Sequence, residues 1–179
     1  LSRKRKVIIM SFEKITLTEA NLNPFEKIGK DWVLLTAGDE NNYNTMTASW
    51  GTMGVMWNKN IFMAVVRPSR FTYSLMENND TFSVSMFGKN YREALSFCGS
   101  YSGKEGDKNE KVKELGLNMI MLDNTPAFDE SEIVLVCKKL YVQPMDKSFY
   151  LDNALFETNG TQPLHTEFWG EIIGAYKKA

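Results

Sequence analysis

One stretch of the chain, residues 44–72, reads NTMTASWGTMGVMWNKNIFMAVVRPSRFT and joins two strand-like segments to a charged turn. Residues 45–49 are rich in β-branched and hydroxyl side chains, and residues 61–66 are apolar throughout, as in a strand buried on both faces. Two arginines and two hydroxyl residues follow at once: Arg67, Ser69, Arg70 and Thr72. The stretch predicts a strand pair that ends at a polar, cationic turn.

The turn has the composition of a phosphate site. Ser69 is expected to cap a helix that begins there, and a helix N-terminus beside guanidinium groups attracts phosphate. The hydroxyl-rich strand before it offers a surface on which a flat polar ring can lie, with Trp50 available for stacking. These features favour a ligand made of an aromatic ring and a phosphate tail. The alternative is a solvated helix start with one salt bridge, and a core tryptophan beside two edge hydroxyls.

Working outward, the pattern predicts four more strands, at residues 32–36, 81–87, 133–142 and 168–176. Residues 81–87 alternate between apolar and hydroxyl side chains, which predicts a strand buried on one face only. Helices are expected at residues 69–78, 90–98 and 107–115, and Gly51 and Gly54 indicate a bulge or a close approach to the backbone. Six strands and three short helices without βαβ alternation predict a mainly β fold, an antiparallel β-barrel with peripheral helices.

Bulk composition narrows the class of protein. The 179 residues suit one domain, and a net charge of −1 gives no bias toward nucleic acid or an anionic membrane. No apolar run approaches the roughly 20 residues of a membrane helix. Cys98 and Cys137 form no CxxC pair and His165 is the single histidine, so neither a disulfide framework nor a metal site is expected. The cysteine usage suits the cytoplasm.

The N-terminal residues 1–9, LSRKRKVII, are expected to be a tag or an over-extended start, with Met10 as the natural first residue and residues 10–179 as the domain. A basic targeting arm is the alternative. The sequence contains no GxSxG elbow, no GxGxxG fingerprint and no GxxxxGK[ST] loop, which sets aside hydrolase, Rossmann and P-loop chemistry.

Four segments carry a resemblance to a known family. NTMTASWG at 44–51, RPSRFT at 67–72, SGKEGDK at 102–108 and HTEFWGEI at 165–172 resemble, in that order, conserved blocks of the flavin reductase-like, FMN-binding split-barrel family. Within it they are most similar to the flavoredoxin-like branch, over residues 23–179. The resemblance implies a six-stranded antiparallel barrel and a homodimer with FMN near the subunit interface.

The resemblance also implies roles for individual residues. His165 would lie near the reactive face of the flavin as the catalytic residue, and Lys104 or Lys108 would be the flavin-binding lysine. The family's usual SGR reads SGK here, which leaves the role of Lys104 open. The full set implied to bind the cofactor is Asn44, Thr45, Met46, Thr47, Ala48, Ser49, Trp50, Arg67, Ser69, Arg70, Thr72, Lys104 and Lys108.

The function implied is an oxidoreductase in which NADH or NADPH passes a hydride to N5 of FMN, which then reduces free flavin or another small acceptor. An alternative is a flavoredoxin-like electron carrier fed by a redox protein partner. A third, from a different class, is a flavin-free barrel that acts as a binding module. Neither nucleic acid nor a membrane is an expected partner.

Overall fold

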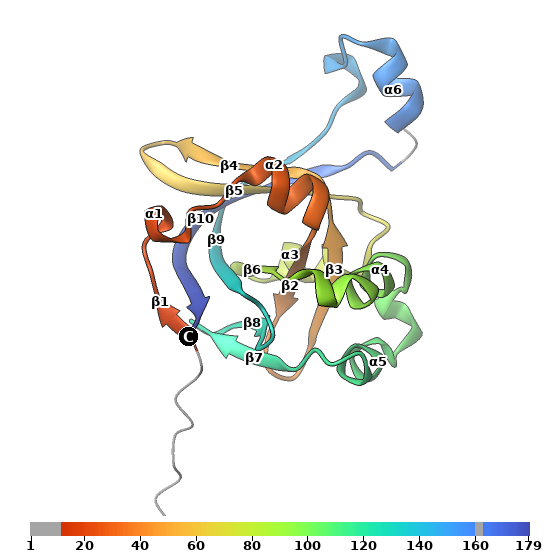
Figure 1. Cartoon of the computed structure of the whole chain (residues 1–179). Coiled ribbons are helices and arrows are strands. Elements are labelled where there is room, and N and C mark those ends of the chain that lie inside the picture. Colours follow the sequence, from red (N-terminus) through yellow and green to blue (C-terminus); the bar gives the residue numbers. More distant parts are fainter. Residues whose placement is uncertain (1–11, 160–162) are drawn as a thin grey trace, which may run out of the picture.

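An antiparallel sheet of eight strands forms the body of the molecule, in a computed structural model that describes residues 12–159 and 163–179. The hydrogen-bonded order is β3-β2-β6-β9-β10-β5-β4, and β1 pairs with β10. The strands are β1 Phe12–Lys14, β2 Val33–Gly38, β3 Tyr43–Ala48, β4 Gly51–Met56, β5 Lys59–Val66, β6 Thr81–Met86, β9 Ile133–Pro144 and β10 Thr166–Lys178. The sheet curls on itself (Figure 1), but its end strands β3 and β4 are not paired with each other. The mainly β class and the split barrel are therefore confirmed.

All six predicted strands are present, but the count of six is too low. Of the two expectations for Gly51 and Gly54, the close approach is present at Gly51, where an added Cβ would lie 2.6 Å from the carbonyl oxygen of Met63. The segment itself is strand β4, which pairs with β5 through a tight turn at Trp57 and Asn58. Its two glycines have low β-strand propensity, so the local sequence does not predict a strand here. Pairing with β5 provides the stability that the residues of β4 lack. A separate hairpin, β7 Met119–Leu122 with β8 Thr125–Phe128, was also not expected.

The three predicted helices are present as α3 Phe71–Asn78, α4 Arg92–Ser100 and α5 Lys108–Glu114. Arg70, not Ser69, precedes the first turn of α3, and no side chain caps that turn, so the predicted Ser69 cap is wrong. The remaining segments are α1 Leu17–Ala20, α2 Pro24–Glu26, the π-helical turn η1 Lys27–Asp31, the 3₁₀ turns η2 Lys89–Tyr91, η3 Gly103–Glu105 and η4 Lys147–Phe149, and α6 Asn153–Asn159. In the described residues, no helix is both long and apolar enough to cross a membrane.

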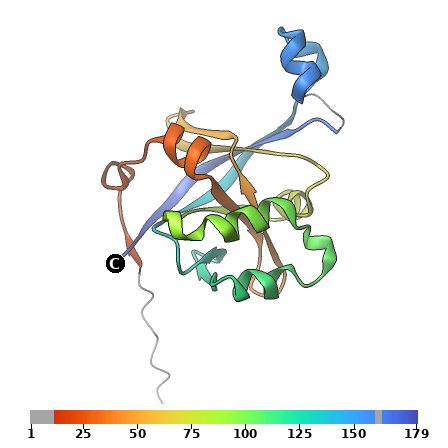
Figure 2. The ribbon, with the colours of Figure 1, turned by 45° about the vertical axis from the view of Figure 1, so that its right-hand side comes forward.

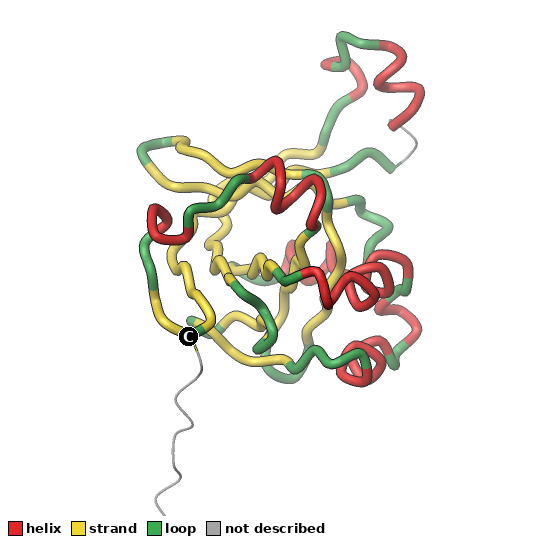
Figure 3. The backbone as a smooth tube through the Cα atoms, viewed as in Figure 1, coloured by secondary structure: helices red, strands yellow, loops and turns green. Residues whose placement is uncertain are grey.

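Helices α4 and α5 lie on one side of the curled sheet (Figure 3), and α6 stands away from it in both ribbon views (Figures 1 and 2). The segment before α6 leaves the end of β9, and the segment after it returns to β10. The expected start at residues 1–9 lies outside the described residues. The described residues thus carry every candidate site residue, and residues 145–159, which include α6, form a projecting arm.

Strand β6 departs from its predicted burial. Ser83 and Ser85 are as fully buried as the apolar residues between them, although alternation predicted one solvent-facing side. The β7–β8 hairpin covers that side, and the Ser83 hydroxyl donates to the carbonyl of Pro126 at 2.6 Å. Tertiary cover, which the local pattern does not encode, decides the burial here.

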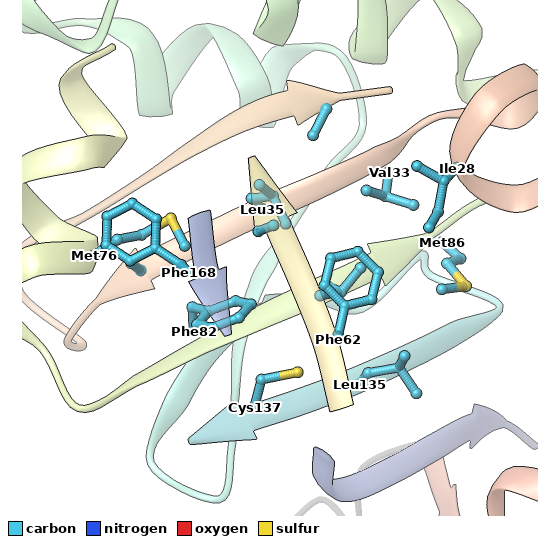
Figure 4. Packing of buried hydrophobic residues seen from close by; sticks show 14 of the residues in the cluster. Ile28, Val33, Leu35, Phe62, Met76, Phe82, Met86, Leu135, Cys137 and Phe168 are labelled. Atoms are coloured by element: carbon cyan, nitrogen blue, oxygen red, sulfur yellow. The ribbon is translucent and has the colours of Figure 1, made fainter. Parts of the chain in front are cut away.

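The core fills the interior of the curled sheet with large side chains from opposite strands (Figure 4). Phe62, Phe82 and Phe168 are fully buried there. Gly170 on β10 permits this packing, because a Cβ atom at that position would come within 2.8 Å of both Phe82 and Cys137. A tightly packed core fixes the ends of β3 and β5, where the candidate site lies.

Candidate functional site

Two neighbouring cavities lie along the second half of β3 and share Met46 and Arg70 as lining residues. The first, which we call the ring-side cavity, has a volume of about 280 Å³. The second, the phosphate-side cavity, has a volume of about 170 Å³. Residues 46–50, Val65, Arg67, Arg70, Gly99 and His165 line the ring-side cavity, and Asn44, Met46, Ser69, Arg70, Phe71, Thr72, residues 100–103 and Lys108 line the phosphate-side cavity.

The ring-side cavity is built where β3 leaves the sheet. Because β3 ends at Ala48, the following Ser49 and Trp50 turn out of the strand and line the same space as the residues before them. The hydroxyl of Thr47 donates to the carbonyl of Leu95, which holds α4 against this strand. Trp50 remains 46% exposed, so one face of its indole is available to a ligand.

His165 and Arg67 form a coupled pair in the same cavity. The Nε of Arg67 donates to Nε2 of His165 at 3.0 Å, and the imidazole ring lies 4.9 Å from the Trp50 ring, centroid to centroid. A guanidinium only donates, so Nε2 is unprotonated and the proton of the neutral ring is on Nδ1. Burial and the charge of Arg67 lower the pKa of His165, which keeps the imidazole neutral at neutral pH.

The phosphate-side cavity gathers cations and hydroxyls. The guanidinium of Arg70 donates to the backbone carbonyls of Gly99 at 2.7 Å and Cys98 at 3.2 Å, at the end of α4. The ammonium of Lys108 donates to the carbonyls of Thr45 at 2.7 Å and Cys98 at 3.3 Å, although only 3% of this residue is exposed. The arrangement brings two positive charges to one small cavity.

Neither cation has an acidic partner among the described residues. Among the residues that the structure describes, no carboxylate forms a salt bridge within 4.0 Å of Arg70 or Lys108. Burial lowers the pKa of Lys108 to about 8 and also lowers the pKa of Arg70. A buried cation such as Lys108, or a half-buried one such as Arg70, is energetically unfavourable when it meets only neutral carbonyls, and a ligand anion would relieve that cost.

The start of α3 faces the same space. Phe71 and Thr72, its first two residues, line the phosphate-side cavity, and no side chain of the helix start accepts from its free amides. The side chain of Asn44 points toward the start of α3, where its Nδ2 donates to the Thr72 hydroxyl at 2.6 Å. Gly103 approaches so closely that an added Cβ would overlap Asn44 and Phe71. An anion in the cavity would thus meet amides as well as two cations.

Most of the predicted cofactor-binding residues line one of the two cavities, and two do not. Thr45 directs its hydroxyl to Leu35 and Thr36 inside the sheet, so only its carbonyl, which accepts from Lys108, relates to the site. Lys104 lies exposed on η3 and does not line either cavity. Of the two lysines left open by the sequence, Lys108 is the one beside the cavity.

Several lining residues were not predicted as site residues. They are Val65, Phe71, Gly99, Ser100, Tyr101, Ser102 and Gly103. Ser102 and Gly103 belong to the SGK block quoted above, so a signal for them was present, whereas α4 brings Gly99 to Thr47 only through tertiary packing. No group of three or more potential metal-ligating side chains occurs in the described part of the chain.

The fold is thus a curled antiparallel sheet whose end strands are not paired with each other, and it carries one cavity beside Trp50 and another beside Arg70 and Lys108. The chain belongs to the flavin reductase like domain family, whose model matches residues 25–177. The family resemblance stated from the sequence is thereby confirmed. The comparison with curated protein sequences gives no match.

Solved structures share the fold at low identity. Flavoredoxin from Methanosarcina acetivorans is 22% identical, with a TM-score of 0.65 over 82% of this chain and 68% of that one. An FMN-binding domain of a flavin reductases-like enzyme from Shewanella baltica is 16% identical, with a TM-score of 0.65 over 93% and 77%. An NADH:FAD oxidoreductase from Streptomyces globisporus is 17% identical, with a TM-score of 0.58 over 82% and 74%.

Proposed function

We propose that the protein binds FMN across the two cavities and is an oxidoreductase that uses NADH or NADPH to reduce flavin or another small acceptor. The observation that carries the proposal is the pair of cations, Arg70 and Lys108, that lack a carboxylate partner among the described residues and line the cavity next to the exposed indole of Trp50. FMN has a phosphate at one end and a flat ring at the other, which match the cationic cavity and the neighbouring indole.

The chain's residues divide the binding between them. Arg70, Ser69, Thr72 and the free amides of α3 would hold the phosphate, while Trp50 and the residues before it would lie along the ring. FMN, when bound, supplies the hydride chemistry. The ammonium of Lys108, which lines the phosphate-side cavity with Arg70, would add a second positive charge for the phosphate.

The resemblance implies that Arg67, together with Arg70 and Thr72, holds the phosphate and ribityl chain, but we propose that Arg67 acts on His165 instead. Its guanidinium contacts His165 in the ring-side cavity, whereas the phosphate-side cavity is lined by Arg70 without Arg67. Arg67 would therefore orient the neutral imidazole so that its Nδ1 proton is available as a hydrogen-bond donor at the ring. His165 would act as a donor and not as a cationic acid.

The visible absorbance spectrum of the purified protein tests the proposal. Flavin peaks that bleach within seconds of anaerobic addition of NADH or NADPH are the expected result. Rapid bleaching by only one nicotinamide would identify the donor. A colourless protein that takes up no added FMN would refute the proposal and leave a flavin-free binding module.

A second function, an electron carrier fed by a protein donor, is favoured by exposed aromatic side chains next to the site. Trp57 and Tyr141 are 55% and 45% exposed and lie 6.1 Å apart, centroid to centroid, on one surface with Trp169. Exposed aromatic clusters are typical of protein contact surfaces. Flavin peaks that persist under both nicotinamides but bleach with a reduced iron–sulfur protein would establish this carrier role. The cytoplasm stays the proposed location for either function.

A further inference from the structure

A third and larger cavity adjoins the ring-side cavity. Its volume is about 910 Å³, and it shares Trp50 and His165 with the ring-side cavity. Its other walls come from the end of β9, the start of β10 and the arm at residues 145–159. We call it the arm cavity. Whatever occupies it lies next to the side chains that would face the flavin ring.

The walls of the arm cavity are mainly apolar and aromatic. Tyr141, Phe149, Tyr150, Leu151 and Leu155 all contribute to it. Phe149 is 81% exposed and Leu151 is 99% exposed, so these side chains have little cover from the rest of the described chain. A space of this size and composition is suited to a planar aromatic molecule.

The charge of the arm cavity is opposite to that of the phosphate-side cavity. Asp146, Asp152 and Glu167 line it, and none of the described lining residues is a lysine or an arginine. Local hydrogen bonds hold these carboxylates in place: Asp152 accepts from the amide of Leu155, and Glu167 accepts from the indole of Trp169 at 2.9 Å. Hydrogen bonds from Ser148 also lower the pKa of Asp146, which keeps it ionised. Three carboxylates beside an apolar wall repel anions.

We propose that the arm cavity binds an uncharged or positively charged aromatic molecule beside the flavin ring, and that its carboxylates exclude anionic aromatic molecules of the same shape. The part that makes this molecule a substrate rests on the proposed function. The diphosphate of a dinucleotide donor is anionic, so it would lie outside this cavity. The cavity thereby selects neutral or cationic acceptors.

Three bicyclic probes of similar shape test the selection: 2-naphthol (neutral), 1-methylquinolinium (cationic) and naphthalene-2-sulfonate (anionic). Dissociation constants are measured by isothermal titration calorimetry on the full chain, with and without FMN. The neutral and cationic probes are expected to bind about tenfold more tightly than the sulfonate at low salt. Added salt should narrow that ratio, because it screens partly exposed carboxylates.

A double variant isolates the carboxylates. Asp152→Asn with Glu167→Gln removes two negative charges but keeps the oxygens that accept from Leu155 and Trp169. Sulfonate affinity should rise by roughly three- to tenfold, with little change for 2-naphthol. The matched control is Glu157→Gln, which removes a carboxylate from the same arm, on α6, without touching the cavity lining, and should leave all three affinities unchanged.

Equal affinity for the three probes, or a probe ratio that the double variant leaves unchanged, would overturn the proposal. So would the absence of probe binding together with a dimer that Leu151→Asp converts to a monomer, because a second copy of the chain would then occupy the arm cavity. The probe experiment can fail independently of the proposed function. A protein that takes up no FMN but discriminates between the probes keeps the arm site, and one that binds FMN without discrimination loses it.

Discussion

At the scale of single residues, the two lysines of the SGKEGDK block show how position decides function. Lys108 is buried beside the phosphate-side cavity with two carbonyls as partners, whereas Lys104 is exposed and outside it. Both belong to one short polar segment, and in sequence they look alike. The helix α5 begins at Lys108, and the side chains of Lys108 and Asn109 donate to carbonyls of β3, which points Lys108 inward. Burial therefore singles out the lysine whose charge needs a ligand anion.

Replacing Arg70 tests the phosphate assignment. Arg70→Ala should weaken FMN binding by about 1.5 to 3 kcal/mol, because it removes a charge-assisted hydrogen bond to the phosphate. Fluorescence titration measures the affinity. Lys104→Ala is the matched control, since it removes a cation that does not line the cavities, and it should leave the affinity unchanged. An unaltered affinity in a folded Arg70→Ala protein would contradict the assignment.

Titration of Lys108 predicts a pH dependence of binding. Burial lowers its pKa to about 8, so the ammonium in the free protein loses its proton as pH rises through that value. An anionic ligand needs the charged form, and FMN affinity should therefore be constant below pH 8 and fall above it. Affinity measured from pH 6.5 to 9.5 checks this. Lys108→Arg should remove the fall, because arginine stays protonated; a fall that persists in this variant would assign it to another group.

At the scale of elements, the β4–β5 hairpin shows how a turn can stabilise a weak strand. Trp57 and Asn58 both have positive φ, 53° and 56°, as a tight turn between twisted antiparallel strands requires. Asparagine tolerates this conformation, whereas tryptophan rarely adopts it. Trp57 instead gains contact with the rings of Tyr141 and Trp169 across the sheet. Cross-strand contact thus offsets an unfavourable backbone conformation at one turn position.

A substitution at this turn measures its contribution. Asn58→Ala should lower the free energy of unfolding by about 1 kcal/mol, because alanine pays the left-handed backbone penalty. The midpoint of urea denaturation reports the change. Asn58→Gly is the matched control and should be close to the wild type, since glycine adopts positive φ freely. Equal losses in both variants would instead point to the side chain of Asn58.

At the scale of elements, sequence patterns located strands β2, β3, β5, β6, β9 and β10 and helices α3, α4 and α5, but they missed the apolar strand β7 and the helix α6. They failed where stability comes from elsewhere in the chain. Strand β4 contains Gly51 and Gly54 and exists through pairing with β5. Ser83 and Ser85 keep an alternating pattern although the β7–β8 hairpin covers them. Hairpins that cover or pair with distant segments leave no local periodic signal.

At the scale of the whole molecule, the exposed edge of the sheet predicts an association between copies. Val55 and Met56 on the edge strand β4 are 73% and 40% exposed, and Trp57 follows them. An apolar sheet edge is a surface that proteins cover by pairing or contact. We expect a homodimer formed through this hairpin, with each subunit near the other's flavin.

Sedimentation equilibrium tests the dimer. The wild type should sediment as a dimer that holds FMN, and Val55→Asp should shift it toward the monomer, because it places a charge on the apolar edge. Leu151→Asp on the arm is the matched control and should leave the dimer intact. A wild-type monomer that binds FMN with full affinity would show that one subunit completes the site.

The sequence by itself determined the mainly β class, six of the strands, the helices at the site and the cationic turn, because each of these depends on residues close together in the chain. Its four spaced motifs also determined the family, which the match over residues 25–177 confirms. The tertiary structure alone decided that Lys108 and not Lys104 lies in the site, that Thr45 faces the sheet interior, and that Arg67 contacts His165. It also decided that an apolar cavity with acidic residues adjoins the ring-side cavity at Trp50 and His165. Those outcomes depend on which distant segments pack together, and the local periodicity of the sequence does not predict such long-range packing.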